Sequence, residues 1–379
     1  MNVEVSPGPE PDVLAGARKA AAAFFPDATR LVPLSDSPDL TRVEDASGNW
    51  YLRRWPREVP PERVALIHGA LERASSAGVE VVPRVAALAG RPEERIIVID
   101  GALYDAQSAL PGRPLARPRP EASPAGGALR LPAAPSPEVM AELIETIARW
   151  HVATAPLATA PGVPAFPLLA MVERVRDVWR GQRERLIPLA AISPAVRRWL
   201  RLSAQMLPQA ATALEAVPEL TRASSVVGHF ALWPAHVLIE RTDDGTERLS
   251  GLIDFRWAAA GSAMVDLAHL STHFGGWTGA TAEETLGRYS AIAPLPPTER
   301  RLLPMVAALD LIAEAGTLLE IAFRPPTRDI PTPPSQVRTG AVTLVNGLEA
   351  LERLVGQGDT RTPSRARPWV HRPKVQRGR

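Results

Sequence analysis

A cluster of prolines divides this chain into two parts. Eight prolines fall between Pro111 and Pro137, and a stretch with so few N–H donors and so many fixed φ angles cannot form a regular helix or an inner strand. We therefore predict a linker or loop over residues 111–137. The sequence before it, residues 1–110, favours strands, and the sequence after it, residues 138–354, favours helices.

The first part predicts a small, mostly antiparallel sheet. Apolar and polar residues alternate over several short runs, and Asp45–Gly48 and the pair Asp100-Gly101 provide turns between them. The predicted strands are 40–44, 49–54, 81–85, 95–99 and 102–108. An Ala-rich helix is predicted over 12–25, and a second helix begins at Pro60-Pro61 and ends before Gly78.

The second part predicts a helical lobe with one group of strands inside it. Ser136 is a predicted N-cap for a helix that ends near Val152. The other predicted helices are 170–186, 194–216, 264–273, 282–289, 297–323 and 335–354. Strands are predicted at 226–227, 237–240 and 248–253, with Asp243–Gly245 as a turn.

Charge and composition narrow the classes of function. The chain has no cysteine, which excludes thiol nucleophiles, disulfides and cysteine-bound zinc. Residues 355–379 carry a net +6 of the chain's total of +2, which leaves −4 on the rest, so we predict a basic flexible tail on a body that disfavours nucleic acid. We see no apolar run near the roughly 18 residues of a membrane helix and no signal peptide, so we expect a cytoplasmic protein without a membrane partner.

The most informative stretch is residues 226–270, where Asp254 directly follows the apolar end of a strand. Its motifs are His229-Phe230-Ala231, then His236, then Ile253-Asp254-Phe255, then Asp266-Leu267-Ala268. Their order and spacing resemble those of the aminoglycoside phosphotransferases, the phosphotransferase enzyme family with a protein-kinase-like fold. Leu52–Pro56, Leu110–Gly112 and Ala148–His151 extend the resemblance to residues 31–354.

The resemblance implies an α+β, two-lobed protein-kinase-like fold, with a small antiparallel-sheet N-terminal lobe and a mainly helical C-terminal lobe. It also implies ATP with Mg or Mn as cofactor and phosphoryl transfer to a hydroxyl of a small molecule. By the same resemblance, Asp254 is a metal ligand and Asp266 a structural brace of the catalytic loop.

Three positions depart from the family pattern. Ala231 stands where the family has the aspartate that acts as general base, and a methyl group cannot accept a proton. His236 stands at the asparagine that binds the metal, although magnesium prefers oxygen ligands. Arg53 stands at the phosphate-binding lysine, and the only lysines are Lys19 and Lys374.

The remaining nucleotide machinery is altered as well. The glutamate that pairs with the lysine would fall near Ile67 or His68, so Glu72 is the nearest acid that could reach an arginine. The phosphate-covering loop would lie at residues 34–41, which contain no glycine and two carboxylates, Asp36 and Asp39. Among the residues that hold the nucleotide and its metal in the family, only Asp254 is retained in identity.

Several interpretations stay open for the individual residues. Asp254 is either a metal ligand or a hydrogen-bonded strand end, and Arg53 could bind a nucleotide phosphate. His229 is expected to be a packed histidine, although His229, His236 and Asp254 together could bind a metal. Trp233 could fill the space of a substrate hydroxyl.

We therefore predict a catalytically impaired member, a pseudokinase, that binds nucleotide or a small molecule between its lobes. One alternative is an active ATP-dependent phosphotransferase whose base is His236 or an acid outside the loop. Another is a structural or protein-interaction module that uses residues 111–137 or the tail. The sequence does not identify an acceptor or a protein partner.

Overall fold

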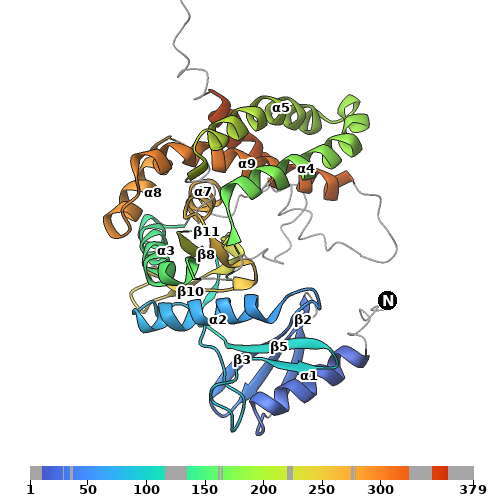
Figure 1. The fold of residues 1–379 in the computed structure, drawn as a ribbon, viewed down its shortest axis with the longest axis vertical. Helices are drawn as coiled ribbons and strands as arrows, with labels where there is room; N and C mark the ends of the chain where they lie inside the picture. Colours follow the sequence, from blue (N-terminus) through green and yellow to red (C-terminus); the bar gives the residue numbers. More distant parts are fainter. Residues whose placement is uncertain are drawn as a thin grey trace, which may run out of the picture.

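An antiparallel sheet forms the smaller lobe (Figure 1). The computed structural model describes residues 11–28, 30–34, 37–115, 135–160, 163, 165–219, 225–274, 277, 279–323 and 344–356. The five strands lie in the order β1-β2-β3-β5-β4. Their bounds are Arg30–Leu34 (β1), Ser37–Asp45 (β2), Gly48–Arg54 (β3), Ile97–Ile99 (β4) and Ala102–Ser108 (β5). The pairing of β2 with β3 places Val43 opposite Trp50 and Leu40 opposite Arg53.

Two helices accompany this sheet, and they belong to different hydrophobic cores. Helix α1 (Pro11–Phe24) packs with the strands in a small core that includes Phe24, Val43 and Leu52. Helix α2 (Pro61–Ser76) lies between the sheet and the larger lobe (Figure 1). Its apolar face, Val64, Ile67 and Leu71 among it, joins the core of the larger lobe and packs against α3.

The structure corrects three predictions in the first lobe. Residues 81–85 do not form a strand, because Pro83 interrupts the apolar run. Val85 makes an isolated bridge with Gln107. Strand β1 was not predicted, because Pro33 disfavours an inner strand. β1 pairs at the edge of the sheet, where a proline is tolerated. Most of the predicted phosphate-covering loop is strand β2, while Asp36 lies outside the described residues.

Helices dominate the larger lobe. They are α3 (Pro137–Ala158), α4 (Leu168–Leu186), α5 (Pro194–Glu215), α7 (Met264–His273), α8 (Gly279–Ile292) and α9 (Pro297–Phe323), and residues 344–356 are also helical. Ser136 caps α3, as predicted, by accepting a hydrogen bond from the Val139 N–H at 3.3 Å. α3 continues past Val152 to Ala158, so His151 lies inside the helix and not at its end.

Two three-stranded sheets lie at the junction of the lobes. One has the order β10-β9-β6, from Glu247–Leu252 (β10), Val237–Arg241 (β9) and Arg113–Pro114 (β6). The other is β7-β11-β8, from Ala165–Phe166 (β7), Ala259–Gly261 (β11) and Val226–Gly228 (β8). The proline-rich segment therefore begins with a short strand, and its residues 116–134, like the tail from 357 on, lie outside the described part.

Gly112 fixes the connection between the lobes. Its φ of +95° is a left-handed conformation, and a Cβ there would lie 2.6 Å from the backbone oxygen of Ile239 in β9. The chain passes so close to β9 that only glycine fits. On the other side of the junction, the Leu252 N–H donates to the Val81 carbonyl at 2.7 Å.

One described helix, α9, is long and apolar enough by composition to cross a membrane, with a mean hydropathy of 1.7. The expectation that no segment reaches this length was therefore wrong. Most of this stretch is buried inside the lobe, where α9 packs against α4, α5 and α7.

Candidate functional site

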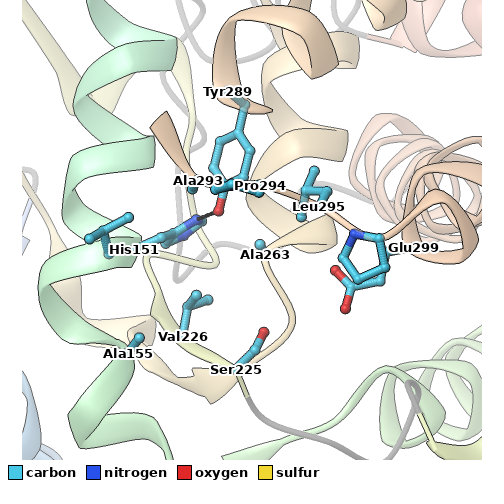
Figure 2. Close-up of a pocket in the computed structure, with 12 residues that line it drawn as sticks. His151, Ala155, Ser225, Val226, Ala263, Tyr289, Ala293, Pro294, Leu295 and Glu299 are labelled. Atoms are coloured by element: carbon cyan, nitrogen blue, oxygen red, sulfur yellow. Dashed lines mark hydrogen bonds between the residues drawn. The ribbon is translucent and has the colours of Figure 1, made fainter. Parts of the chain in front are cut away.

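A cavity of about 260 Å³ lies beside α3, α8 and the start of α9 (Figure 2). His151 and Tyr289 face it and are joined by a hydrogen bond of 2.9 Å, and Glu299 adds one carboxyl group whose pKa is raised by burial. The rest of its described wall is mainly apolar, and none of the predicted site residues is among the described residues that line it. We therefore place the candidate site elsewhere, on the loop after β8.

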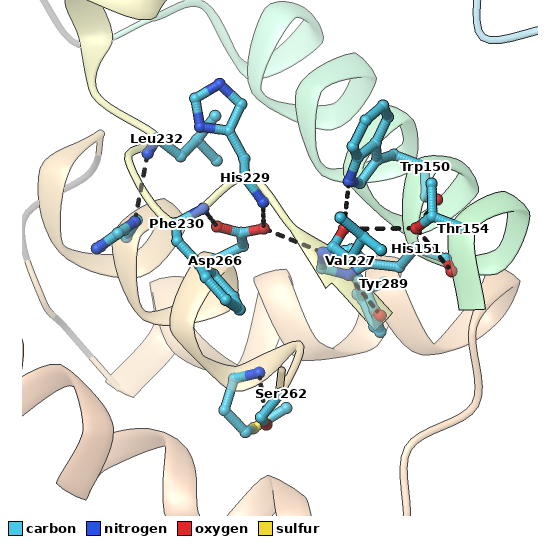
Figure 3. A network of polar contacts seen from close by, with 12 residues as sticks. Trp150, His151, Thr154, Val227, His229, Phe230, Leu232, Ser262, Asp266 and Tyr289 are labelled. Carbon is cyan, nitrogen blue, oxygen red and sulfur yellow. Dashed lines mark hydrogen bonds and ion pairs between the residues drawn. The ribbon is translucent and has the colours of Figure 1, made fainter. Parts of the chain in front are cut away.

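Asp266, at the start of α7, fixes that loop through hydrogen bonds to its backbone (Figure 3). One carboxylate oxygen accepts from the His229 N–H at 2.7 Å and the other from the Phe230 N–H at 2.8 Å. His151 Nε2 donates a third hydrogen bond, at 3.0 Å. Burial would raise the pKa of Asp266, but the hydrogen bond and charge of His151 and the nearby His229 lower it to about 2.

His229 is a packed, neutral histidine. Its Nδ1 accepts from the Ala231 N–H at 3.3 Å, so Nε2 carries the proton and donates to the Ile253 carbonyl at 3.0 Å. Burial lowers the pKa of His229 to about 4. Both ring nitrogens are therefore occupied by backbone groups, and His229 has no nitrogen available to bind a metal.

Ala231 fills the position of the expected general base, and it is buried. Its backbone oxygen accepts from the His236 Nδ1–H at 2.6 Å and from the Trp233 N–H at 3.0 Å. The ring of Trp233 packs against His273 of α7, with the ring centroids 4.2 Å apart and the ring planes tilted by 41°. The loop thus offers backbone polar groups and a methyl group where a carboxylate is expected.

Asp254 and three cationic or polar partners form the centre of the site. Asp254 Oδ1 lies 3.1 Å from Arg53 Nη2, and Oδ2 lies 3.2 Å from Arg256 Nε and 3.4 Å from His236 Nε2. Only 14% of the Arg53 side chain and 15% of the Asp254 side chain are exposed. Asp254 has the left-handed φ of 64°, which turns the chain at the end of β10.

The protonation of His236 follows from its contacts. Because the Ala231 carbonyl can only accept, Nδ1 carries the proton, and Nε2 points toward Asp254. Burial, followed by smaller effects of the Arg256 and Arg53 charges, lowers the pKa of His236, although the Ala231 carbonyl and Asp254 oppose this. His236 is therefore neutral at pH 7, with an unprotonated Nε2.

This donor set does not fit magnesium. Asp254 and His236 together offer one carboxylate and one imidazole nitrogen, whereas magnesium takes an octahedron of oxygens. Two guanidinium groups already share the carboxylate, which leaves a net positive charge where a divalent cation would sit. The same two arginines are suited to an anion such as phosphate.

The glutamate expected on helix α2 as the partner of Arg53 is replaced by a histidine, His68. Glu72 pairs with Arg95 at 2.9 Å, not with Arg53. His68 Nε2 instead contacts the carboxylate of Asp105 on β5 at 2.8 Å, and Asp105 also accepts from Trp55 Nε1 at 2.8 Å. Burial raises the pKa of Asp105, but the hydrogen bond and charge of His68 outweigh this effect and lower it. The contact between His68 and Asp105 therefore joins α2 to the sheet.

Sequence reasoning missed two residues of this site. Arg256 stands two positions after Asp254, and its charge beside a suspected metal ligand was an available signal. Asp105 gave none, because it lies in an ordinary strand and its partners, His68 of α2 and Trp55 just after β3, are distant in the sequence. Lys19, the one lysine in the described residues, forms an exposed pair with Asp100 at 3.0 Å.

Comparisons with known proteins agree with this architecture. A model of the phosphotransferase enzyme family matches residues 31–316. An aminoglycoside phosphotransferase from Alicyclobacillus acidocaldarius shares the fold with a TM-score of 0.57 and 15% identity, covering 95% of this chain and 98% of its own. A spectinomycin phosphotransferase bound to AMP has a TM-score of 0.59 and 9% identity, covering 88% and 96%.

A microcompartment-associated aminopropanol kinase is also similar, with a TM-score of 0.54, 16% identity and coverage of 90% and 97%. The search of curated proteins gave no match. At these identities the solved structures show the shared kinase-like fold, and the family model covers most of the chain. The chain therefore belongs to the phosphotransferase enzyme family.

Proposed function

We propose that this protein is a catalytically impaired member of its family, a pseudokinase whose interlobe site binds the phosphates of a nucleotide without transferring one. The observation that carries the proposal is the state of Asp254, whose carboxylate is paired with Arg53 and Arg256. Ala231, which cannot act as a base, supports it from the same loop.

In this proposal Arg53 and Arg256 are the phosphate contacts. Both guanidinium groups reach the same carboxylate, so an incoming polyphosphate competes with Asp254 for them. Asp254 is then a competitor of the ligand, whereas in an active kinase it is required to hold the metal that bridges the phosphates. The two functions therefore predict opposite effects of removing its charge.

The test is a thermal-shift titration of the full chain with ATP, with and without Mg²⁺ or Mn²⁺. For Asp254→Asn we expect ATP to bind about 2- to 10-fold more tightly than in the wild type, since a part-buried ion pair of roughly 0.5–1.4 kcal/mol no longer competes. Arg53→Ala should weaken binding, and the wild type should bind ATP without metal.

ATP hydrolysis by the wild type should equal that of Asp254→Asn. The opposite result, metal-dependent binding or hydrolysis that Asp254→Asn abolishes, would show an active enzyme and overturn the proposal. The absence of any ATP-dependent shift in the wild type would reject nucleotide binding.

One observation favours an active phosphotransferase as a second candidate. The unprotonated Nε2 of His236 lies 3.4 Å from Asp254, beside the residue that binds the metal in an active family member, where a relocated base would be needed. This candidate predicts phosphoryl transfer to a hydroxyl acceptor that His236→Ala abolishes and Asp254→Asn reduces.

We also propose that the protein acts as a soluble cytoplasmic protein. The support is that α9, the one described helix both long and apolar enough to span a membrane, lies mostly buried among α4, α5 and α7. Separation of a cell lysate into membrane and soluble fractions tests this directly.

A further inference from the structure

A second group of titratable side chains lies between α7 and α9, apart from the Asp254 site. His269 and His273 are four residues apart on α7, and Asp310 and Glu314 are four residues apart on α9. Side chains at this spacing share one face of a helix. The two helices pack against each other (Figure 1), so the two pairs meet; we call these four residues the α7–α9 cluster.

Asp310 lies between the two imidazole rings. Its Oδ1 is 3.2 Å from His269 Nε2, and its Oδ2 is 2.9 Å from His273 Nε2. The ligand atoms of these three residues all lie within 4.8 Å of one another. Both histidine side chains are only 4% exposed, so the group is removed from solvent at the cost of desolvation.

We propose that His269, His273 and Asp310 bind a divalent transition metal ion, with zinc as the best match. Two imidazole nitrogens and one carboxylate form the donor set of zinc sites that keep a fourth position open. Magnesium and calcium prefer oxygen ligands throughout, and the absence of cysteine from the chain leaves histidine and carboxylate as its zinc ligands.

Glu314 supplies the support that such a site needs. Its Oε2 lies 3.4 Å from Nδ1 of His273, on the side of the ring opposite Asp310. A ligating histidine usually donates its second N–H to a carboxylate, which fixes the ring and raises its basicity. Glu314 is thus placed to orient His273 while Nε2 binds the ion.

The charges of the α7–α9 cluster also favour a cation. Asp310 and Glu314 both face His273, and their side chains are only 14% and 11% exposed. A divalent ion on Nε2 of His273 would lie beside Asp310 and balance part of this buried negative charge.

Metal binding at this position would reach the loop that carries Ala231. His269 Nδ1 accepts from the Leu232 N–H at 3.4 Å, so its Nε2 now carries a proton that faces Asp310. Ligation through Nε2 moves that proton to Nδ1 and breaks this long contact. Trp233, the next residue, packs its ring against His273, so occupancy of the site and the conformation of the loop are linked.

The experiment uses the full chain without an affinity tag, stripped with a chelator and titrated with zinc chloride by calorimetry. We expect one zinc ion per chain and, with Co²⁺ in its place, the visible absorption of a four-coordinate ion. Glu314→Gln should weaken zinc binding about 10- to 100-fold, and His273→Ala or Asp310→Asn should weaken it at least as much.

His236→Ala is the matched control, because it removes a histidine that lies beside Asp254 and not in the α7–α9 cluster. It should leave zinc binding unchanged. The proposal is overturned if the wild type binds no zinc, if the cobalt spectrum is that of a six-coordinate ion, or if only His236→Ala abolishes binding. The wild-type measurements decide even if a variant fails to fold, and none of them depends on ATP binding.

Discussion

At the residue scale, Asp266 is the group on which the candidate loop depends most. It accepts three hydrogen bonds, from the backbone of His229 and Phe230 and from His151. For Asp266→Asn we expect a loss of about 3 kcal/mol in the free energy of unfolding at pH 7, because a buried anion with paired donors is removed. Urea denaturation measures this, with the exposed Asp243→Asn as a control that should change little.

The pH dependence of that loss is a separate prediction. The pKa of Asp266 falls from 3.8 to about 2 on folding, so its stabilisation is complete above about pH 4 and disappears as the pH falls toward 2. A shift of this size is worth on the order of 2 kcal/mol. The difference between wild type and Asp266→Asn should therefore shrink over this range, and a difference that stays constant down to pH 2 would contradict the assignment.

Single residues also show what the sequence can and cannot predict about the site. Asp254 was identified from its position after a strand, and Ala231 from the spacing of the motifs. The pairing of Asp254 with Arg53 was not, because 201 residues separate them and only the closed junction of the lobes brings them together. The α7–α9 cluster was missed although both of its i, i+4 pairs are visible in the sequence, because no local pattern says that the two helices face each other.

At the scale of elements, the connection at Gly112 is expected to be intolerant of any side chain. Gly112→Ala adds a Cβ against the Ile239 carbonyl and also forces a left-handed φ, so we expect a loss of about 2 kcal/mol or more. Gly245→Ala, in the turn between β9 and β10, has a similar φ of +86° and its nearest contact at 3.5 Å, so it should cost only about 1 kcal/mol. Equal losses in the two variants would show that the close approach to β9 is unimportant.

Prediction of the elements succeeded where a local signal was complete. Ser136 and Pro137 mark the start of α3 unambiguously, and the turn residues of Asp45–Gly48 define the pairing of β2 with β3. It failed at residues 81–85, where an apolar run looked like a strand but has one isolated bridge in place of a ladder. Val81 accepts from Leu252 of β10, and Arg84 bonds to Ser108 of β5. A segment buried against another lobe needs the same apolar residues as a strand buried in a sheet, so its composition does not distinguish the two.

At the scale of the whole molecule, the two hydrophobic cores predict two parts of the chain that unfold locally and independently of each other. The sheet and α1 share one core, whereas α2 packs with α3 in the other. Hydrogen exchange monitored by mass spectrometry should therefore show residues 61–76 protected like residues 137–158 and more strongly than residues 37–54. If α2 exchanges together with β2 and β3, the two cores do not open separately.

The fold class was predictable at this scale because its signals add up over long stretches. Strand patterns before the proline-rich segment and helix patterns after it agree with the order of motifs, and the structure has the corresponding sheet and helical lobe. The assignment of α2 to the core of the larger lobe could not be predicted, because its apolar stripe would fit either the sheet or α3 equally well.

The pairing of Lys19 with Asp100 on the surface has a practical consequence for chemical labelling. Reagents that acylate amines act on lysine, and nucleotide probes of that type depend on a lysine beside the bound phosphates. In the described part of this chain such a reagent would modify the side chain of Lys19 on α1, which is 60% exposed, and leave Arg53 and Arg256 intact. A fluorophore attached there would report on the sheet lobe while the phosphate contacts stay chemically unchanged.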